Sequence, residues 1–393
     1  MPDQYDFSLV LGGPLFQLAR RARLADDAME LLRRRMLAIT LLAWAPLLLL
    51  SVLGGRAWGR ADQLPFLFDV SIHARLLLAL PLLIWAELIV HRRLHLVARQ
   101  FIDRGLIAAS SRARFDAAMA SALRLRNSVV AEIVLLAVVY AVFAGYVWPE
   151  FRLVSARVSS WYGDAVGGEW HLTPAGKWRL YVSLPLFQFI LLRWYYRIFI
   201  WIRLLWQVSR CELSLVPTHP DRVGGLGFLS QTPMAFAPLL AAHGVVLAGL
   251  IANPIFFYGG RLPEFKDEIV AVVGLIVLLV LVPLLFFMTK LAAAKRLGLR
   301  EYGNLAQRYV REFDEKWLRG GVARDEALVG SADIQSLADL GNSFELVRSM
   351  RFAPITRDAV LQLLFVTLLP VAPLLLTMIP LNEIMRTLVK VLM

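Results

Sequence analysis

The segment Ile269–Met288, IVAVVGLIVLLVLVPLLFFM, contains 20 residues and no charged or hydrogen-bonding side chain. The hydrocarbon core of a bilayer is about 30 Å thick, and a helix needs about 20 apolar residues to cross it. Because backbone amides and carbonyls cannot stay unpaired in hydrocarbon, such a segment is expected to cross the membrane as an α-helix. This stretch predicts a membrane protein.

Six more apolar segments of similar length occur in the chain. Together with Ile269–Met288 the predicted spans are Met36–Leu53, Ile72–Val90, Val129–Trp148, Leu180–Ile202, Met234–Tyr258 and Ala359–Ile379. All but Val129–Trp148 contain proline, which predicts kinked helices. The expected fold class is an all-α polytopic transmembrane bundle of about seven spans, with a small cytoplasmic helical portion.

The composition supports this prediction and excludes several classes of protein. Hydrophobic residues make up 58% of the 393 residues and charged residues 18%, against about 45–50% and about 25% in soluble domains. The net charge of +12 comes from arginines between the apolar runs, which is typical of loops retained at anionic lipid rather than of nucleic-acid binding. The single cysteine, Cys211, allows no intrachain disulfide and no cysteine-based zinc site. No metal and no cofactor is expected.

The distribution of arginine predicts the orientation. Residues 91–128 hold eight arginines, whereas residues 54–71 hold two, and positive loops resist translocation. We therefore expect residues 1–35, 91–128, 205–232 and 290–358 to lie in the cytoplasm. With seven crossings by residues 36–289 and 359–379, the C-terminal tail would lie in the periplasm of a bacterial inner membrane, and the amphipathic segment 1–35 in the cytoplasm.

The cytoplasmic segment 290–358 has two amphipathic helical patterns. Apolar residues recur at helical spacing from Tyr302 to Trp317 and again from Ala332 to Met350, where Ser331 is the expected N-cap. Their apolar faces must pack against the bundle, the membrane surface or a neighbouring subunit. The chain is expected to form a homo-oligomer.

Four charged residues lie within the predicted spans, where each costs roughly 2.5–3.5 kcal/mol at a helix centre. They are Glu87, Glu132, Arg193 and Arg197. Counted along the helices, all four belong to the cytoplasmic half of the membrane, and Arg193 and Arg197 share one helical face. They either form buried ion pairs that fix the packing of three helices or line an aqueous route for an ion or proton. Two acids against two bases predict a nearly neutral group.

His243 lies in the fifth predicted span beside Gly244, Ala248 and Ala252. Small residues at four-residue spacing let another helix approach closely. His243 is expected either to make a packing hydrogen bond or to respond to protonation.

The segment Pro217–Phe228, PTHPDRVGGLGF, lies between the fourth and fifth spans and cannot form a regular helix, because its prolines and glycines predict a specified turn. Consecutive amides in such a turn can bind an anion. The residues of interest are His219, Asp221, Arg222, Gly224, Gly225 and Gly227. Three interpretations of the segment are kept: a purely structural turn, a cytoplasmic gate and a ligand site. The segment lacks the glycine spacing of dinucleotide-binding and P-loop motifs.

The favoured function is a channel or transporter for a small ion or solute, with the buried charges near its route. One alternative is a sensor or assembly scaffold that acts through its cytoplasmic helices. Another is a membrane enzyme that acts on a lipid headgroup at the inner surface, although no hydrolase or metalloprotease motif is found.

Overall fold

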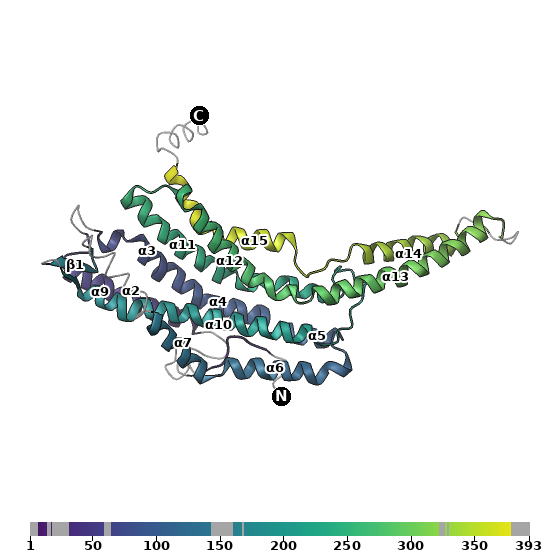
Figure 1. Ribbon diagram of the computed structural model, residues 1–393, viewed down its shortest axis with the longest axis horizontal. Helices are drawn as coiled ribbons and strands as arrows, with labels where there is room; N and C mark the ends of the chain where they lie inside the picture. Colours follow the sequence, from purple (N-terminus) through teal and green to yellow (C-terminus); the bar gives the residue numbers. More distant parts are fainter. Residues whose placement is uncertain are drawn as a thin grey trace, which may run out of the picture.

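The computed structural model describes residues 7–13, 17, 31–58, 64–142, 160–166, 169–321, 327 and 330–378. The helices form an elongated bundle, and a helical hairpin projects from one end of it (Figure 1). The opposite end carries a short antiparallel pair of strands, β1 (Gly163–Val166) and β2 (Glu169–Leu172). We call these the hairpin end and the strand end. The expected all-α class is confirmed, and the strands are a small addition that the sequence analysis did not predict.

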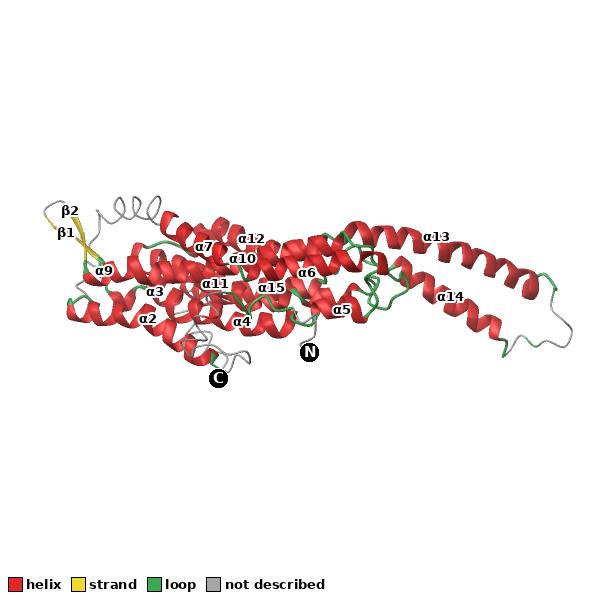
Figure 2. Ribbon diagram, turned by 90° about the horizontal axis from the view of Figure 1, so that it is seen from below, coloured by secondary structure: helices red, strands yellow, loops and turns green. Residues whose placement is uncertain are grey.

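The bundle is built from helices that differ widely in length. In chain order they are α2 (Leu32–Leu53), α3 (Val70–His73), α4 (Leu80–Leu94), α5 (Val97–Asp103), α6 (Arg112–Arg126), α7 (Val129–Val142), α9 (Pro174–Trp178), α10 (Leu184–Ser209), α11 (Ala237–Tyr258), α12 (Lys266–Leu285) and α15 (Arg357–Leu368). Wider helical turns over Ala74–Ala79 and Arg179–Ser183 join α3 to α4 and α9 to α10. Two further helices, α13 (Met288–Phe313) and α14 (Ala332–Arg348), form the projecting hairpin. Figure 2 shows it from another side.

Within the described residues, five helical stretches are long and apolar enough to cross a membrane. They are Leu32–Leu53, Val70–Asp103, Leu226–Tyr258, Leu262–Leu285 and Arg357–Met378. A sixth arises if α6 and α7, which meet at a bend of 49°, count as one crossing. Large apolar side chains remain exposed on these stretches, among them Leu37, Leu41 and Leu275, as expected of surfaces that face lipid. The chain is therefore a multispanning membrane protein by the length and composition of its helices.

Among the described residues the candidate spans number five or six, against the seven predicted. The helix α10, which contains most of the predicted span Leu180–Ile202, is 26 residues long but is not among the candidate spans. Its arginine, tyrosine and tryptophan residues lower its mean hydropathy. Several of these side chains make polar contacts inside the bundle. Of the predicted span Val129–Trp148, residues 143–148 lie outside the described part of the chain. The side of the membrane on which each end lies stays a prediction, and most of residues 1–35 and all of 379–393 lie outside the described residues.

The helix α11 lies at the centre of the bundle, and its glycines allow close packing. A Cβ built on Gly244 would lie 2.0 Å from the carbonyl oxygen of Thr367 in α15. Ala252 is almost completely buried on the same helix. The predicted small-residue face is therefore a helix contact, and a larger residue at 244 would force α11 and α15 apart.

The two predicted amphipathic helices are present as the hairpin. The Ser331 side chain accepts a hydrogen bond from the Asp333 amide at 3.1 Å, so the predicted N-cap is confirmed. Asp333 also accepts hydrogen bonds from Lys316 and Trp317, at 2.8 and 3.0 Å. These bonds join the far part of α14 to the turn of helix that follows α13, so the two arms are held together well away from the bundle.

Candidate functional site: a buried charge cluster

Five charged side chains from four helices meet inside the bundle, toward the hairpin end. They are Arg35 from α2, Glu87 from α4, Glu132 from α7, and Arg193 and Arg197 from α10. We call them the charge cluster. Their side chains are between 5% and 14% exposed, which is low for arginine and glutamate. The four predicted residues are therefore brought together, and one more joins them.

Glu87 lies at the centre of the cluster. One of its carboxylate oxygens accepts a hydrogen bond from Arg35, and the other lies 2.8 Å from Nη1 of Arg197 and 3.7 Å from Nη1 of Arg193. Three guanidinium groups thus face one carboxylate. Opposite charges at these separations favour the ionised carboxylate, which offsets its removal from water.

The helix α10 positions two of these arginines by its period. Arg193 and Arg197 are one turn apart and point toward α4, while Trp194 donates a hydrogen bond from Nε1 to the Leu83 carbonyl at 2.9 Å. The guanidinium of Arg197 also lies 4.9 Å from the centre of the Trp194 ring, a favourable cation–π distance. The rotation of α10 about its axis is therefore specified by both apolar and polar contacts with α4.

The sequence analysis missed Arg35. It is the last of three consecutive arginines, and composition assigned all three to a cytoplasmic segment. Arg33 and Arg34 are exposed, whereas Arg35 is buried. The helix begins at Leu32, so Arg35 lies in its first turn, and only the packing of α2 on α4 selects that one of the three for the interior.

Arg35 also changes the charge of the site. Within the described residues the cluster contains three guanidinium groups and two carboxylates, not the two and two that the sequence analysis expected. Arg193 lies 3.5 Å from Glu132 and 3.7 Å from Glu87. The first of these contacts is at the outer limit of a hydrogen bond and the second is beyond it. Counted over the described side chains, the cluster carries one more positive charge than negative.

The N-terminal segment Phe7–Gly13 covers the cluster on its hairpin side. Phe7, Leu9 and Val10 are almost completely buried although the segment is not helical. Hydrogen bonds hold the backbone of its first two residues. The Phe7 amide donates to the His95 carbonyl at 3.3 Å, and Arg126 donates to the Ser8 carbonyl at 2.7 Å.

Gly13 brings this segment directly against the charges. A Cβ built there would lie 3.4 Å from Oε1 of Glu132 and 3.9 Å from Nη2 of Arg193. Gly13 has a φ of 90°, which favours glycine. The end of Phe7–Gly13 therefore passes over the two members of the cluster that make the longest ion-pair contacts.

His243 does not join the charge cluster. Its Nδ1 donates to the Leu239 carbonyl at 2.8 Å, and its Nε2 accepts a hydrogen bond from the Tyr195 hydroxyl at 2.6 Å. The ring borders a cavity of about 150 Å³ that is otherwise lined by apolar side chains, including Leu191 and Val246. These contacts agree with a packing hydrogen bond, one of the two roles predicted for His243. The other role, a response to protonation, stays a prediction.

The predicted turn binds its own carboxylate. Oδ1 of Asp221 accepts hydrogen bonds from the amides of Val223 and Gly225 at 2.9 and 3.2 Å, and Oδ2 accepts one from Gly227 at 2.7 Å. His219 Nδ1 lies 2.9 Å from Oδ1. The amides that could have bound an external anion are therefore used within the turn.

These contacts determine both the ionisation of Asp221 and the shape of the turn. Burial raises the pKa of Asp221, but the three amide donors and His219 outweigh it, so the pKa lies below its ordinary value. Arg222 and Gly224 have φ values of 58° and 65°, in the left-handed region. A Cβ on Gly227 would lie 2.8 Å from the Asp221 side chain, so a larger residue there would displace the carboxylate.

The turn also holds the base of the projecting hairpin. Just after α14, the Arg351 amide donates to the Arg222 carbonyl at 2.7 Å, and its guanidinium donates to the Asp221 carbonyl at 3.1 Å. A Cβ on Gly298 of α13 would lie 2.6 Å from Pro217. The turn therefore connects the end of α10 to both arms of the hairpin.

A second buried polar group lies at the strand end. Asp69 accepts hydrogen bonds from Nε1 of Trp161 at 3.0 Å, from the side chain of Asn253 at 2.9 Å and from the Ile72 amide at 3.2 Å. Asp69 precedes α3 and caps it. The contacts fasten the segment before β1 and the helix α11 to the start of α3.

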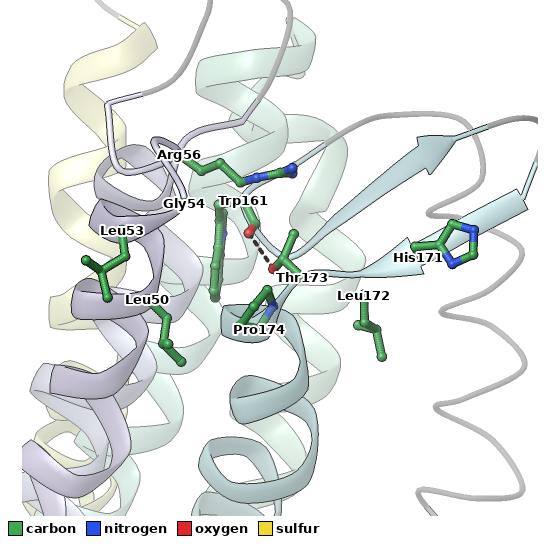
Figure 3. Close-up of a pocket in the computed structure, with 9 residues that line it drawn as sticks. All are labelled: Leu50, Leu53, Gly54, Arg56, Trp161, His171, Leu172, Thr173 and Pro174. Atoms are coloured by element: carbon green, nitrogen blue, oxygen red, sulfur yellow. Dashed lines mark hydrogen bonds between the residues drawn. The ribbon is translucent and has the colours of Figure 1, made fainter.

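A pocket of about 480 Å³ adjoins this group. Figure 3 shows it between the end of α2, the strand β2 and the start of α9. Leu50 and Leu53 lie on the α2 side, Trp161 lies between α2 and the start of α9, and the Arg56 side chain extends above Trp161. Thr173 donates a hydrogen bond to the Trp161 carbonyl at 2.9 Å. The pocket is mainly apolar, with Arg56 and His171 as its charged or titratable side chains.

Among the described residues, no group of three or more histidine, cysteine, aspartate or glutamate side chains is arranged to hold a metal ion. Comparison of the whole chain with protein-family models, with curated proteins and with solved structures finds no significant match in any of the three.

Proposed function

We propose that the protein is a channel or transporter for a small ion or solute and that the charge cluster lies on the route. The observation that carries this proposal is the burial of five charged side chains from four helices of the bundle, two of which, α2 and α4, belong to candidate membrane spans. Charged residues inside membrane helices are costly, and they often mark the paths of ions and protons.

The arrangement of the segment Phe7–Gly13 supports the same proposal. It is a non-helical segment that closes the hairpin end of the cluster, and hydrogen bonds join it to His91 and His95 at the end of α4 and to Arg126 of α6. A cover of this kind can open without unfolding a spanning helix. In this proposal the predicted turn at Asp221 is a rigid connection at the base of the hairpin, and it is not the gate.

A flux assay tests the proposal. The purified full chain would be reconstituted into liposomes, and salt flux would be followed with wild type, Arg193→Gln and Arg124→Gln. Arg124 is exposed on α6 and serves as the matched control. We expect the Arg193 variant to change the flux at least several-fold and the Arg124 variant to leave it unchanged. Wild-type liposomes that are no leakier than empty ones would refute a channel or transporter.

The hairpin supports a second candidate, a sensor or assembly scaffold. It projects beyond the bundle (Figures 1 and 2) and exposes apolar side chains that include Leu297, Val310 and Leu318. Exposed apolar positions on a projecting helix pair are typical of docking surfaces. Deletion of residues 302–345 should abolish copurification of a partner or self-association if this candidate is right, while a transporter would retain its flux.

The enzyme alternative has weaker support. It depended on His219, Asp221 and Arg222, and the Asp221 carboxylate is engaged by three backbone amides of its own turn. The bilayer is the expected partner under each candidate, and orientation with a cytoplasmic N-terminus and homo-oligomerisation remain part of the proposal.

A further inference from the structure

The charge of the cluster indicates what it binds. Arg35, Arg193 and Arg197 face Glu87 and Glu132, so the described side chains carry one more positive charge than negative. A buried charge without a partner is expensive, and a nearby opposite charge is the usual compensation. An anion in contact with the cluster would supply it.

Arg193 is the guanidinium best placed to receive such an anion. Arg35 and Arg197 each lie within hydrogen-bond distance of Glu87, whereas Arg193 contacts Glu87 and Glu132 at 3.7 and 3.5 Å. Among the described residues Arg193 has ion-pair partners but no hydrogen-bond acceptor that meets ordinary geometry. A guanidinium presents five donors in a planar fork that matches compact oxyanions and halides. Its side chain is only 12% exposed, so these donors are held inside the protein.

The segment that covers Arg193 approaches it with backbone alone. Gly13 lies over Arg193 and Glu132 without a side chain, and a Cβ there would fall 3.1 Å from the Arg126 carbonyl and 3.4 Å from Glu132. A side chain at position 13 would crowd Arg126 and Glu132 and would lie in contact with the guanidinium of Arg193. The backbone of Phe7–Gly13 thus forms the cover of a site whose base is Arg193.

We propose that the cluster is a binding site for a compact anion, held mainly by Arg193 with Arg35 and Arg197 contributing charge, and covered by Phe7–Gly13. The identification of this anion as the transported species rests on the proposed function. The anion itself has two sources with the same chemistry, a soluble inorganic ion or the phosphate of an anionic lipid. Glu87 keeps the three guanidinium groups together and limits how strongly the anion is retained.

Binding is tested on the purified full chain in a nonionic detergent with gluconate as the background anion. Chloride, sulfate and inorganic phosphate would be added separately, and the rise in thermal midpoint would be measured. We expect at least one of them to stabilise the wild type, with an apparent affinity about tenfold weaker in Arg193→Gln and unchanged in Arg124→Gln. Nanodiscs of phosphatidylglycerol compared with phosphatidylcholine form the lipid arm, and stabilisation confined to that arm would assign the anion to a lipid headgroup.

Arg193→Lys guards against a variant that simply fails to fold. It keeps the charge but loses the planar fork, so its anion affinity should lie between those of wild type and the glutamine variant. Anion stabilisation that is equal in wild type, Arg193→Gln and Arg193→Lys would overturn the site, as would stabilisation by none of the probes in either arm.

The sign of the flux separates this inference from the proposed function. A reversal potential in a potassium chloride gradient that follows chloride supports both. A potential that follows potassium would leave the transport proposal standing and refute the anion as cargo. Anion binding that depends on Arg193 without any flux would retain the site and refute the transport proposal.

Discussion

Replacing Glu87 by glutamine should be among the most damaging single substitutions in the bundle. The carboxylate faces Arg35, Arg193 and Arg197, and at about 4 Å with an effective dielectric constant of about 20 each such pair is worth roughly 4 kcal/mol before desolvation is subtracted. Without it, Arg193 keeps Glu132 as an acidic partner, while Arg35 and Arg197 have no other ion-pair partner among the described residues. Removing one partner of a buried ion pair typically costs about 3–5 kcal/mol, and we expect a loss of unfolding free energy in that range.

The same reasoning predicts an asymmetry between the acid and its partners. Arg35→Gln removes one hydrogen bond to a charged group, worth about 1.5–3 kcal/mol, but leaves two arginines facing two glutamates. It should therefore destabilise the protein less than Glu87→Gln does. Glu301→Gln, at an exposed position of α13, should change the unfolding free energy by no more than about 0.5 kcal/mol.

Unfolding in mixed micelles of detergent and sodium dodecyl sulfate would measure these differences, with helicity as the signal. If Glu87→Gln unfolded within about 0.5 kcal/mol of wild type, or if Arg35→Gln were the more damaging of the two, the cluster would not be the excess-positive buried group described above.

Three further predictions concern other parts of the fold. Because the pKa of Asp221 is lowered in the folded state, its carboxylate stabilises the protein above its unfolded pKa of about 3.9. That contribution is lost as the pH falls through the folded value, so the difference in thermal midpoint between wild type and Asp221→Asn should shrink below about pH 4. Gly244→Ala should destabilise the bundle by driving a methyl group into the Thr367 carbonyl, whereas Gly274→Ala, which meets nothing within 4 Å, should be neutral or slightly stabilising; thermal melts of both would show it, and equal melts would contradict the packing of α11 on α15. A single cysteine at Leu318, in a background without the native cysteine, should react with an impermeant thiol reagent only in inside-out vesicles, and labelling of intact spheroplasts would reverse the predicted orientation.

The residues that the sequence could identify were those whose meaning is local. The turn at Pro217–Phe228 was predicted from its prolines and glycines, and Ser331 from its position before a helical pattern, because φ preferences and capping depend on a few neighbouring residues. The burial of Glu87, Glu132, Arg193 and Arg197 followed from the length of the apolar runs around them. In each case the information lies within about one or two helical turns.

What could not be predicted depends on distances between parts of the chain that are far apart in sequence. Arg33, Arg34 and Arg35 are consecutive residues of the same type, so the local sequence does not distinguish them. Only the packing of α2 against α4 buries the third. Asp221 could have left its turn open to an external anion, and its carboxylate instead folds back onto the amides of Val223, Gly225 and Gly227.

The sequence by itself determined that this chain is a helical membrane protein, because unpaired backbone groups in hydrocarbon leave a long apolar segment no other regular structure. It also determined that buried charge would need compensation. Only the tertiary structure decided the number and sign of the charges that meet, and which segment covers them, because electrostatic energy depends on the separation of atoms in space and the partners of Glu87 come from positions 35, 193 and 197.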